Sequence, residues 1–427
     1  MRDFLPEEKA RREHVLGVIR REFRNHGFDE IETPVMEDSS RLHAGLGGDN
    51  EKLAYAVLKR GLTTDDYAAV AQGGDPLALV DLGLRFDLTV PLARFYATHQ
   101  AELPSVFRAI QIAPVWRAER PQKGRYRQFV QCDIDIIGEP SWLAEVELIV
   151  ATAATLGALG LNDCRIHIND RRLLTSMLDS FGFSVGSREL VMIVLDKLDK
   201  IAVGGVVAEL RDRAPGETTA IDALESFLTR ARTMEFVSFG DRAIRRELPD
   251  GIDEDAVREL VDLGNAVEAA GIDRSLLQFD PFLVRGMGYY TGTIFEVTHP
   301  DLGYSLGGGG RYDGMIGRFL GTDVSATGFS LGFERLVDLV ELENSERTDA
   351  IALVYDDDVP AAKIAALKTQ VLRDPPGVSP VRVRLERRIK NTKVLLDQLS
   401  TAGYTRYAFV GATTELADLD FRPIAAQ

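Results

Sequence analysis

A helical pattern of apolar residues lies near the start of the chain. Val15, Ile19 and Phe23 recur every four residues, which puts their side chains on one face of an α-helix. Pro6 suits the first position of a helix, and Gly27 is a typical stop signal. We therefore predict one helix between these two residues, with its apolar face packed on a core.

A two-residue period marks the segment QFVQCDIDIIG, residues 128–138. Apolar residues alternate with polar ones there, so each set falls on its own face of a β-strand. The apolar set is Val130, Cys132, Ile134 and Ile136, and the polar set is Gln131, Asp133 and Asp135. A strand-like run from about Val106 to Trp116 precedes this segment across a charged loop at 118–127. The pattern predicts a long antiparallel hairpin.

The remaining patterns outline the rest of the chain. FDEIETPVME is an extended stretch whose Pro34 belongs at a strand edge or end. Residues 45–83 are rich in glycine and weakly periodic, which indicates loops with short strands. Helical patterns fill residues 171–273, and we interpret them as a helical insertion. Patterns typical of β-strands return in FLVRGMGYYTGTIFEVTHP and YSLGGGGRYDG, and a strand followed by a helix is expected at ATGFSLGFERL.

The last eighty residues alternate strand and helix patterns from about Asp349 onward, which predicts a small α/β domain. We thus expect three parts: a core from residues 1–170 and 274–345, a helical insertion at 171–273, and the small domain at 346–427. A length of 427 residues agrees with two or three domains.

Composition narrows the class of protein. The chain has 50 Lys and Arg against 66 Asp and Glu, a net charge of −16, which argues against a passive nucleic-acid coat. Its two cysteines suit a reducing cytoplasm and exclude a cysteine zinc cluster. The charged start does not look like a signal peptide, and no apolar run reaches the ~18 residues of a membrane span. We expect a cytoplasmic protein with no membrane partner.

Three segments carry candidate chemistry. The window from Arg108 to Arg127 holds six basic residues and one acid, so it could bind a triphosphate or simply be solvated. GGGGRYDG is not a P-loop, and its glycines indicate either close ligand approach or a turn. Asp133 and Asp135 could bind a metal, relay protons, recognise a cation, or form an exposed polar face. No histidine pair has metal-ligand spacing, so we predict no protein metal site.

Taken together, these segments resemble histidyl-tRNA synthetases, which are class II aminoacyl-tRNA synthetases. The three motifs that define class II synthetases have counterparts here. The first is similar to GFDEIETPVME, the second to FRAIQIAPVWRAERPQKGRYRQF and the third to GFSLGFERL. LVRGMGYYTGTIFE and GGGGRYDG are similar to the two segments peculiar to histidyl enzymes, and LRFDLTVPLARF also fits. The resemblance implies an α+β fold: a class II antiparallel sheet flanked by helices, a helical insertion and a small C-terminal α/β domain.

The resemblance implies roles for the residues that match these motifs. Arg117 would bind the α-phosphate of ATP, Glu119 the adenine amino group, and Arg125 the terminal phosphates. Phe129 would stack on adenine, and Arg335 would clamp ATP from the opposite side. ATP would act together with Mg²⁺.

L-histidine would occupy the adjoining subsite. Its α-amino end would be held by Asp87, Thr89 and Gln131, and its imidazole would be read by Asp135, Tyr290 and Tyr312. Tyr289 would also border the amino acid. Arg285 would lie between its carboxylate and the α-phosphate, so Arg285 and Arg117 would be the catalytic residues.

The resemblance implies a cytoplasmic homodimer with histidine–tRNA ligase activity, acting on L-histidine and tRNA(His). Two alternatives stay open: a histidine-sensing regulatory subunit of ATP phosphoribosyltransferase, or a synthetase-derived amino-acid ligase. Gly288 replaces the acid usual in the first histidyl segment, and the chain stops at PIAAQ, where relatives usually continue. The basic run from Arg382 to Lys393, with six basic residues and one acid, would meet RNA phosphates or face water.

Overall fold

The computed structural model describes residues 1–43, 53–120, 124, 126–231, 239–284, 289–341, 349–377 and 381–424. The chain divides into two compact units, one of residues 1–2 and 15–340 and one of residues 3–14 and 341–427. Within these described ranges, no helix combines the length and the apolar character that crossing a membrane requires.

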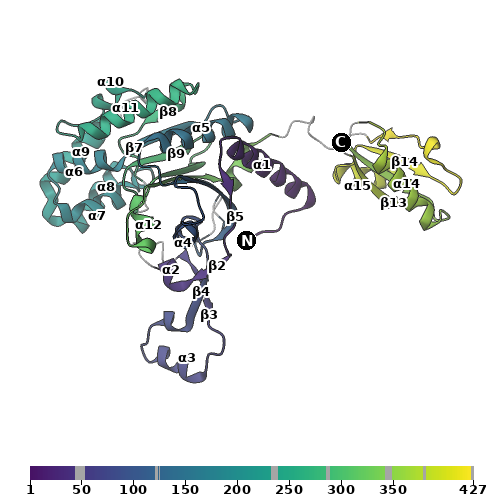
Figure 1. Cartoon of the computed structure of the whole chain (residues 1–427), viewed down its shortest axis with the longest axis horizontal. Helices are drawn as coiled ribbons and strands as arrows, with labels where there is room; N and C mark the ends of the chain where they lie inside the picture. The colour runs from purple at the N-terminus through teal and green to yellow at the C-terminus, as the bar shows by residue number, and fades with distance from the viewer. Residues whose placement is uncertain are drawn as a thin grey trace. The chain divides into compact units, whose positions relative to one another are not determined.

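An eight-stranded sheet forms the centre of the larger unit (Figure 1). Its strands are β1 (Asp29–Glu30), β5 (Phe107–Trp116), β6 (Gln128–Ile137), β7 (Arg165–Asp170), β8 (Leu277–Phe279), β9 (Thr293–Thr298), β10 (Gly307–Arg311) and β11 (Ala326–Gly332). They lie in the order β1-β5-β6-β11-β10-β9-β7-β8. Only the outer pairs β1–β5 and β7–β8 are parallel, so the predicted antiparallel α+β core is confirmed.

The central hairpin of this sheet is the one that the two-residue period predicts. β5 and β6 pair antiparallel along their whole length, from Phe107 opposite Ile137 to Trp116 opposite Gln128. The apolar side chains of β6 join the main core, where Cys132 and Ile134 are fully buried. The polar side chains therefore point to the opposite face of the sheet.

Helices cover both faces of the sheet. The core that contains the apolar β6 residues is completed by α1 (Pro6–Asn25), α5 (Leu143–Ala158), α11 (Glu254–Ala269) and α13 (Phe333–Leu339). Val15, Ile19 and Phe23 of α1 are fully buried in it, as the four-residue spacing predicts. The second core lies on the other face and includes α4 (Thr89–His99) and α12 (Asp313–Leu320).

A run of helices connects β7 to β8 and is coloured teal to green in Figure 1. Besides α11 it comprises α6 (Arg171–Phe181), α7 (Arg188–Leu195), α8 (Leu198–Arg213), α9 (Thr218–Ala231) and α10 (Asp241–Arg246). Residues of α6 to α9 bury apolar side chains in the second core. These helices occupy the stretch where the sequence predicts helices, while the exact domain boundaries remain a prediction.

A small three-stranded sheet, β2 (Met36–Asp38), β4 (Val80–Leu84) and β3 (Tyr55–Leu58), projects from the larger unit together with α2 (Ser39–His43) and α3 (Thr64–Ala71) (Figure 1). The sequence predicts loops and short strands here and misses α3. The helix forms because Thr63 and Asp66 make a capping box, in which the Asp66 carboxylate accepts the Thr63 N–H at 2.7 Å. The strand predicted through FLVRGMGYYTGTIFEVTHP is also shorter than expected, since β9 begins only at Thr293.

The smaller unit contains the predicted α/β arrangement. Its strands are β12 (Asp349–Tyr355), β13 (Val381–Arg387), β14 (Arg406–Val410) and β15 (Arg422–Pro423), in the order β13-β12-β14-β15. The first three are parallel and β15 is antiparallel to β14. One face packs on α14 (Ala361–Arg373) and the other on α15 (Thr392–Thr401), each with its own apolar cluster.

Candidate functional site

A pocket lies on the polar face of β6, β10 and β11 and brings together side chains from distant parts of the chain. Of the site residues predicted from the sequence, it is lined by Asp87, Thr89, Arg117, Glu119, Phe129, Gln131, Asp135, Tyr289, Tyr290, Tyr312 and Arg335. Arg125 and Arg285 lie outside the described residues, as does Gly288. Every described residue of the predicted set is therefore found in one cavity.

The polar face of β6 forms the floor of this pocket. Gln131, Asp133 and Asp135 are 8%, 4% and 4% exposed, so the alternative of an exposed polar face is wrong. The alternation is real, but a second layer of residues covers this face. Polar side chains at three alternate positions of a buried strand need hydrogen-bond partners, from the protein or from a ligand, because an unpaired buried polar group costs free energy.

The glycine run explains how the backbone can approach these side chains. β10 is a regular strand through Gly307–Arg311, so its glycines form neither a turn nor a phosphate loop. Gly328 of β11 lies opposite Asp135, and a Cβ on it would overlap the Asp135 carboxylate. A Cβ on Gly309 would overlap the carbonyl oxygen of Gly328. Glycine here makes space for the carboxylate.

Tyr312 meets Asp135 inside the pocket. Its hydroxyl donates to Oδ1 of Asp135 at 2.5 Å, and both side chains are buried. The ring of Tyr289 packs against those of Tyr290 and Tyr312, with centroids 4.7 and 6.2 Å apart. Burial, and then the Asp135 charge, raise the pKa of the Tyr312 phenol, so Tyr312 remains a hydrogen-bond donor at neutral pH.

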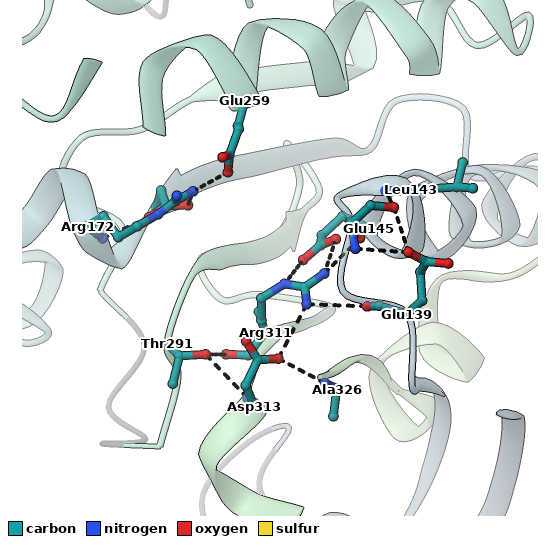
Figure 2. A network of polar contacts seen from close by, with 11 residues as sticks. Glu139, Leu143, Glu145, Arg172, Glu259, Thr291, Arg311, Asp313 and Ala326 are labelled. Carbon is teal, nitrogen blue, oxygen red and sulfur yellow. Dashed lines mark hydrogen bonds and ion pairs between the residues drawn. The ribbon is translucent and has the colours of Figure 1, made fainter. Parts of the chain in front are cut away.

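Ion pairs and hydrogen bonds hold Arg311 and Asp313, the residues before and after Tyr312 in the chain, and Figure 2 shows the contacts of these two residues. The Arg311 guanidinium donates from Nε and Nη2 to the two carboxylate oxygens of Glu145 on α5, at 2.6 and 2.7 Å. Asp313 Oδ1 accepts the backbone N–H of Ala326 at 2.9 Å, and Tyr312 N–H donates to the Ala326 carbonyl at 2.7 Å. Because Arg311 and Asp313 are both anchored, Tyr312 has little freedom to move away from the pocket.

Three carboxylates share the floor and the adjoining wall of the pocket. Burial raises the pKa of Asp87 to about 6 and that of Asp135 to about 7. Burial and the neighbouring Asp135 charge raise the pKa of Asp133 well above its usual value. Arg117 and the Val90 N–H oppose the shift at Asp87, and the Tyr312 hydrogen bond opposes it at Asp135. This end of the pocket is built to receive positive charge.

The other end of the pocket carries cations and an aromatic ring. The Arg117 guanidinium lies 5.0 Å from the ring centroid of Phe129 and donates from Nε to the Phe86 carbonyl at 2.9 Å. Arg335 approaches from α13, donating to the carbonyl oxygens of Gly124 and Ser305. Two arginines held in place by backbone carbonyls suit an anion, and a flat ring suits a planar base.

Some pocket residues are absent from the sequence-based prediction. Ser330 and Asp133 sit on paired positions of β11 and β6, and Glu334 accepts the Val130 N–H at 3.3 Å. Tyr126 lines the wall beside them. The sequence marks Asp133 as a candidate through its two-residue spacing from Asp135, but gives it no place in the histidine or ATP site, and nothing local predicts the others. Among the described residues, no group of three or more His, Cys, Asp or Glu side chains is arranged to hold a metal ion.

The basic run of the smaller unit is less positive than its sequence indicates. Arg387 and Arg388 form ion pairs with Asp357 and Asp356, at 2.5 and 3.2 Å. Within the run itself, Arg384 pairs with Glu386 at 2.8 Å. Other cations of the run stack on rings or face water: Arg382 lies 4.5 Å from the Tyr404 ring centroid, and Lys390 and Lys393 are exposed.

Comparisons with known proteins agree with this geometry. The family described as Histidyl-tRNA synthetase matches residues 1–336. A histidine–tRNA ligase of Leifsonia xyli subsp. xyli is 58% identical over 426 residues, covering 99% of this chain and 97% of that protein. A probable histidine–tRNA ligase of Tropheryma whipplei is 44% identical over 382 residues, which cover 87% of this chain and 86% of that protein.

Two solved structures share the fold. Histidyl-tRNA synthetase from Nostoc sp. superposes with a TM-score of 0.75 at 24% identity, covering 99% of this chain and 93% of that one. A protein described as an ATP phosphoribosyltransferase regulatory subunit/histidyl-tRNA synthetase, from Bacillus halodurans, superposes with a TM-score of 0.73 at 21% identity, covering 97% of both. The family match over residues 1–336 and the 58% identity to the Leifsonia relative establish that the chain belongs to the histidyl-tRNA synthetase family.

Proposed function

We propose that the protein is a histidine–tRNA ligase, which activates L-histidine with ATP and transfers the histidyl group to tRNA(His). One observation carries the proposal: a single cavity joins a carboxylate and tyrosine end to an arginine and phenylalanine end. An amino acid with a cationic head and a nucleotide with anionic phosphates need those two surroundings side by side. The name of the Leifsonia relative, 58% identical over nearly the whole chain, supports the same activity.

Adenylation requires positioning more than a protein nucleophile. The histidine carboxylate attacks the α-phosphorus of ATP, a P–O bond forms, and pyrophosphate leaves with the electron pair of the broken P–O bond. Arg117 would hold the α-phosphate, with Phe129 against the adenine ring and Glu119 at its amino group. Arg335 would clamp the nucleotide from the opposite wall. Arg125 and Arg285 would add charge at the terminal phosphates and the attacking carboxylate.

Magnesium would enter with the nucleotide. Among the described residues, no group of three or more His, Cys, Asp or Glu side chains is arranged so that it could hold a metal ion by itself. Glu334 also lines the pocket, whereas Glu119 would be engaged at the adenine amino group. Mg²⁺ commonly binds through substrate phosphates, waters and one or two carboxylates, so this lining fits a metal–nucleotide complex better than a resident ion. When bound, the metal would neutralise phosphate charge.

The carboxylate end would select histidine. Asp87, Thr89 and Gln131 would receive the α-ammonium group, while Asp135 and Tyr312 would each meet one imidazole nitrogen. Tyr289 and Tyr290 would border the ring. An amino acid without an imidazole would leave the buried Asp135 and Tyr312 groups without a ligand partner, which a polar pocket penalises strongly.

The smaller unit would contact tRNA. Exposed Lys390 and Lys393, together with Arg382 stacked on Tyr404, offer positive charge for phosphates. The enzyme would act as a cytoplasmic homodimer. Val35 and Met36, beside Pro34, are large apolar side chains that are 42% and 47% exposed, which supports an interface there.

Two assays on the same preparation test the proposal. Histidine-dependent exchange of labelled pyrophosphate into ATP reports adenylation, and acid-stable histidylation of tRNA(His) reports transfer. We expect both reactions. Exchange without charging would indicate a ligase for a small acceptor, and histidine binding without either reaction would indicate a sensor. Omitting histidine, or replacing it with another amino acid, provides the control.

A further inference from the structure

The side-chain amide of Gln131 is held in one orientation by its neighbours. Nε2 donates to Oδ2 and Oδ1 of Asp133, at 3.2 and 3.4 Å, and to Oγ of Ser330 at 3.1 Å. Asp133 and Ser330 face each other on paired strands, so they present their oxygens to the same nitrogen. All of the hydrogen bonds found for this side chain are therefore on its nitrogen.

The carbonyl oxygen at the other end of the amide is left open. Oε1 of Gln131 is buried and has no hydrogen-bond partner among the described residues, and the same is true of Oδ2 of Asp87. Both residues line the pocket and are more than nine-tenths buried. An unpaired buried acceptor costs free energy, so two of them in one cavity point to a ligand that donates N–H groups.

An amide has no intrinsic reason to point its oxygen into the pocket. Its oxygen and nitrogen ends are nearly equal in size, and hydrogen bonds alone decide the orientation. An ionised carboxylate can only accept, so an ionised Asp133 forces the nitrogen of Gln131 toward itself. The oxygen is consequently turned to the opposite side, toward the ligand.

We propose that Asp133 is a positioning residue that orients Gln131, so that the pocket presents acceptors to a primary ammonium group and rejects ligands without one. The inference rests on the proposed function, in which that group is the α-ammonium of L-histidine. An –NH3⁺ group has three N–H donors, and Asp87 Oδ2 and Gln131 Oε1 offer two open acceptors.

The same arrangement makes recognition of the ammonium depend on pH. A protonated Asp133 gains an O–H donor, which would pair with the carbonyl of Gln131 and turn its NH2 group toward the ligand. The groups facing Asp133 are the carboxylates of Asp87 and Asp135, Gln131 and Ser330. Burial and the Asp135 charge both favour that protonated form in the empty pocket. An ammonium ligand favours the ionised form, so its binding should release protons.

The test compares two ligands in the intact protein. L-histidine carries the α-ammonium, and 3-(imidazol-4-yl)propanoate carries the same imidazole and carboxylate without it. Dissociation constants for both, and for ATP, are measured for the parent, Asp133→Asn and Ser330→Ala. An asparagine at position 133 can both donate and accept, so it can pair with either end of the Gln131 amide and no longer fixes its orientation. Asp133→Asn should therefore raise the dissociation constant of histidine about ten- to hundred-fold and change those of the analogue and ATP by no more than a few-fold. Ser330→Ala keeps the carboxylate and should have a smaller effect.

The pH dependence of the preference for histidine over the analogue distinguishes the proposed role of Asp133 from a purely structural one. The α-ammonium group lowers the imidazole pKa of histidine below that of the analogue, so each dissociation constant is first corrected for the imidazole titration of its own free ligand. In the parent, preference for histidine should fall as the pH is lowered from 8 to 5.5, and in Asp133→Asn the slope should be shallower. If Asp133→Asn does not fold, Ser330→Ala decides, because it removes one partner of the Gln131 nitrogen and should lower the preference for histidine while ATP binding stays within a few-fold.

Two different failures can be told apart. Equal weakening of both ligands by Asp133→Asn, or a histidine preference in the parent that does not change with pH, would overturn the role of Asp133. A parent protein that shows no histidine-dependent pyrophosphate exchange would instead overturn the proposed function, and this inference with it.

Discussion

The hydroxyl of Tyr312 donates a 2.5 Å hydrogen bond to Asp135, although the two residues are 177 positions apart in the chain. The contact joins the residue after β10 to the polar face of β6, across the intervening strand β11. Gly328 of β11 lies directly opposite Asp135 and has no side chain to block the contact. The pair thus depends on three separate segments, each with a specific residue type.

Replacing Tyr312 with Phe should selectively impair histidine recognition. The change removes the hydroxyl that lowers the Asp135 pKa and leaves a buried carboxylate without its donor. Loss of a hydrogen bond to a charged group costs about 1.5–3 kcal/mol, so we expect the KM for histidine to rise roughly 10- to 100-fold. Pyrophosphate exchange at varied histidine and ATP measures this. An increase in the ATP KM of similar size would contradict the assignment.

Asp135 should destabilise the empty protein at neutral pH. Burial raises its folded-state pKa to about 7, above the ~3.9 of an unfolded aspartate. A carboxyl group whose pKa is higher in the folded than in the unfolded state stabilises the fold while it is protonated. This contribution is complete below pH ~4 and is lost as the pH rises through 7. Asp135→Asn does not titrate and can still accept from Tyr312. Its melting temperature should match the parent's at pH 4 and exceed it by a few degrees at pH 8. A lower value at pH 8 would refute this.

The ion pair beneath Tyr312 should matter for both stability and recognition. The Arg311 and Glu145 side chains are 12% and 1% exposed, so Glu145→Gln removes the closer, bidentate counter-ion of a buried charge and leaves only Asp313, at 3.3 Å. Breaking a buried pair typically costs about 3–5 kcal/mol. We expect a lower melting temperature and, because Arg311 adjoins Tyr312, a higher histidine KM with the ATP KM little changed.

A surface pair provides the matched control for Glu145→Gln. Arg258 and Asp255 are 64% and 69% exposed in an i, i+3 pair, so Arg258→Gln should leave both melting temperature and kinetics close to the parent's. Differential scanning fluorimetry and exchange kinetics on both variants decide the matter. Similar behaviour of the two variants would mean that the Arg311 network does not support the site.

Local patterns predict the elements of the fold well. The spacing of Val15, Ile19 and Phe23 gives α1, and the alternation around Cys132 gives β6, because each depends only on which side of the element is apolar. The helix α3 is missed because its start depends on a capping box between Thr63 and Asp66 in a stretch otherwise rich in glycine.

Local patterns do not predict partners far apart in sequence. The two-residue period places Asp133 and Ile134 on opposite faces of the strand, but it does not predict whether the polar face is exposed to solvent or buried. Nothing near Arg311 indicates that Glu145, 166 residues away, is its counter-ion. The resemblance to a family identifies most pocket residues, since motif spacing carries information that periodicity lacks.

The basic run of the smaller unit shows the same limit and alters the choice of test. Its sequence gives a net charge of +5, yet Asp356 and Asp357 pair with Arg388 and Arg387. Those arginines are partly neutralised, so reversing their charge would also break two ion pairs. A cleaner test of RNA binding therefore uses exposed cations of the run for which the described residues give no ion pair.

Lys390 and Lys393 meet that requirement, and we predict that reversing both to Glu weakens tRNA(His) charging without altering adenylation. Lys393 lies in the first turn of α15, where an acidic residue is favoured by the helix dipole, so the reversal should not unfold the unit. Each lost phosphate contact should lower the slope of log affinity against log salt by about 1. The KM for tRNA should rise while pyrophosphate exchange stays constant.

The opposite change in the same unit gives the control. Asp356→Asn with Asp357→Asn frees the guanidinium groups of Arg388 and Arg387, so tRNA affinity at low salt should increase and its salt dependence should steepen. Adenylation should be unaffected in both double variants, because every pocket residue lies at or before Arg335. If neither pair of changes moves the tRNA KM or its salt slope, the smaller unit does not bind the tRNA backbone through this run.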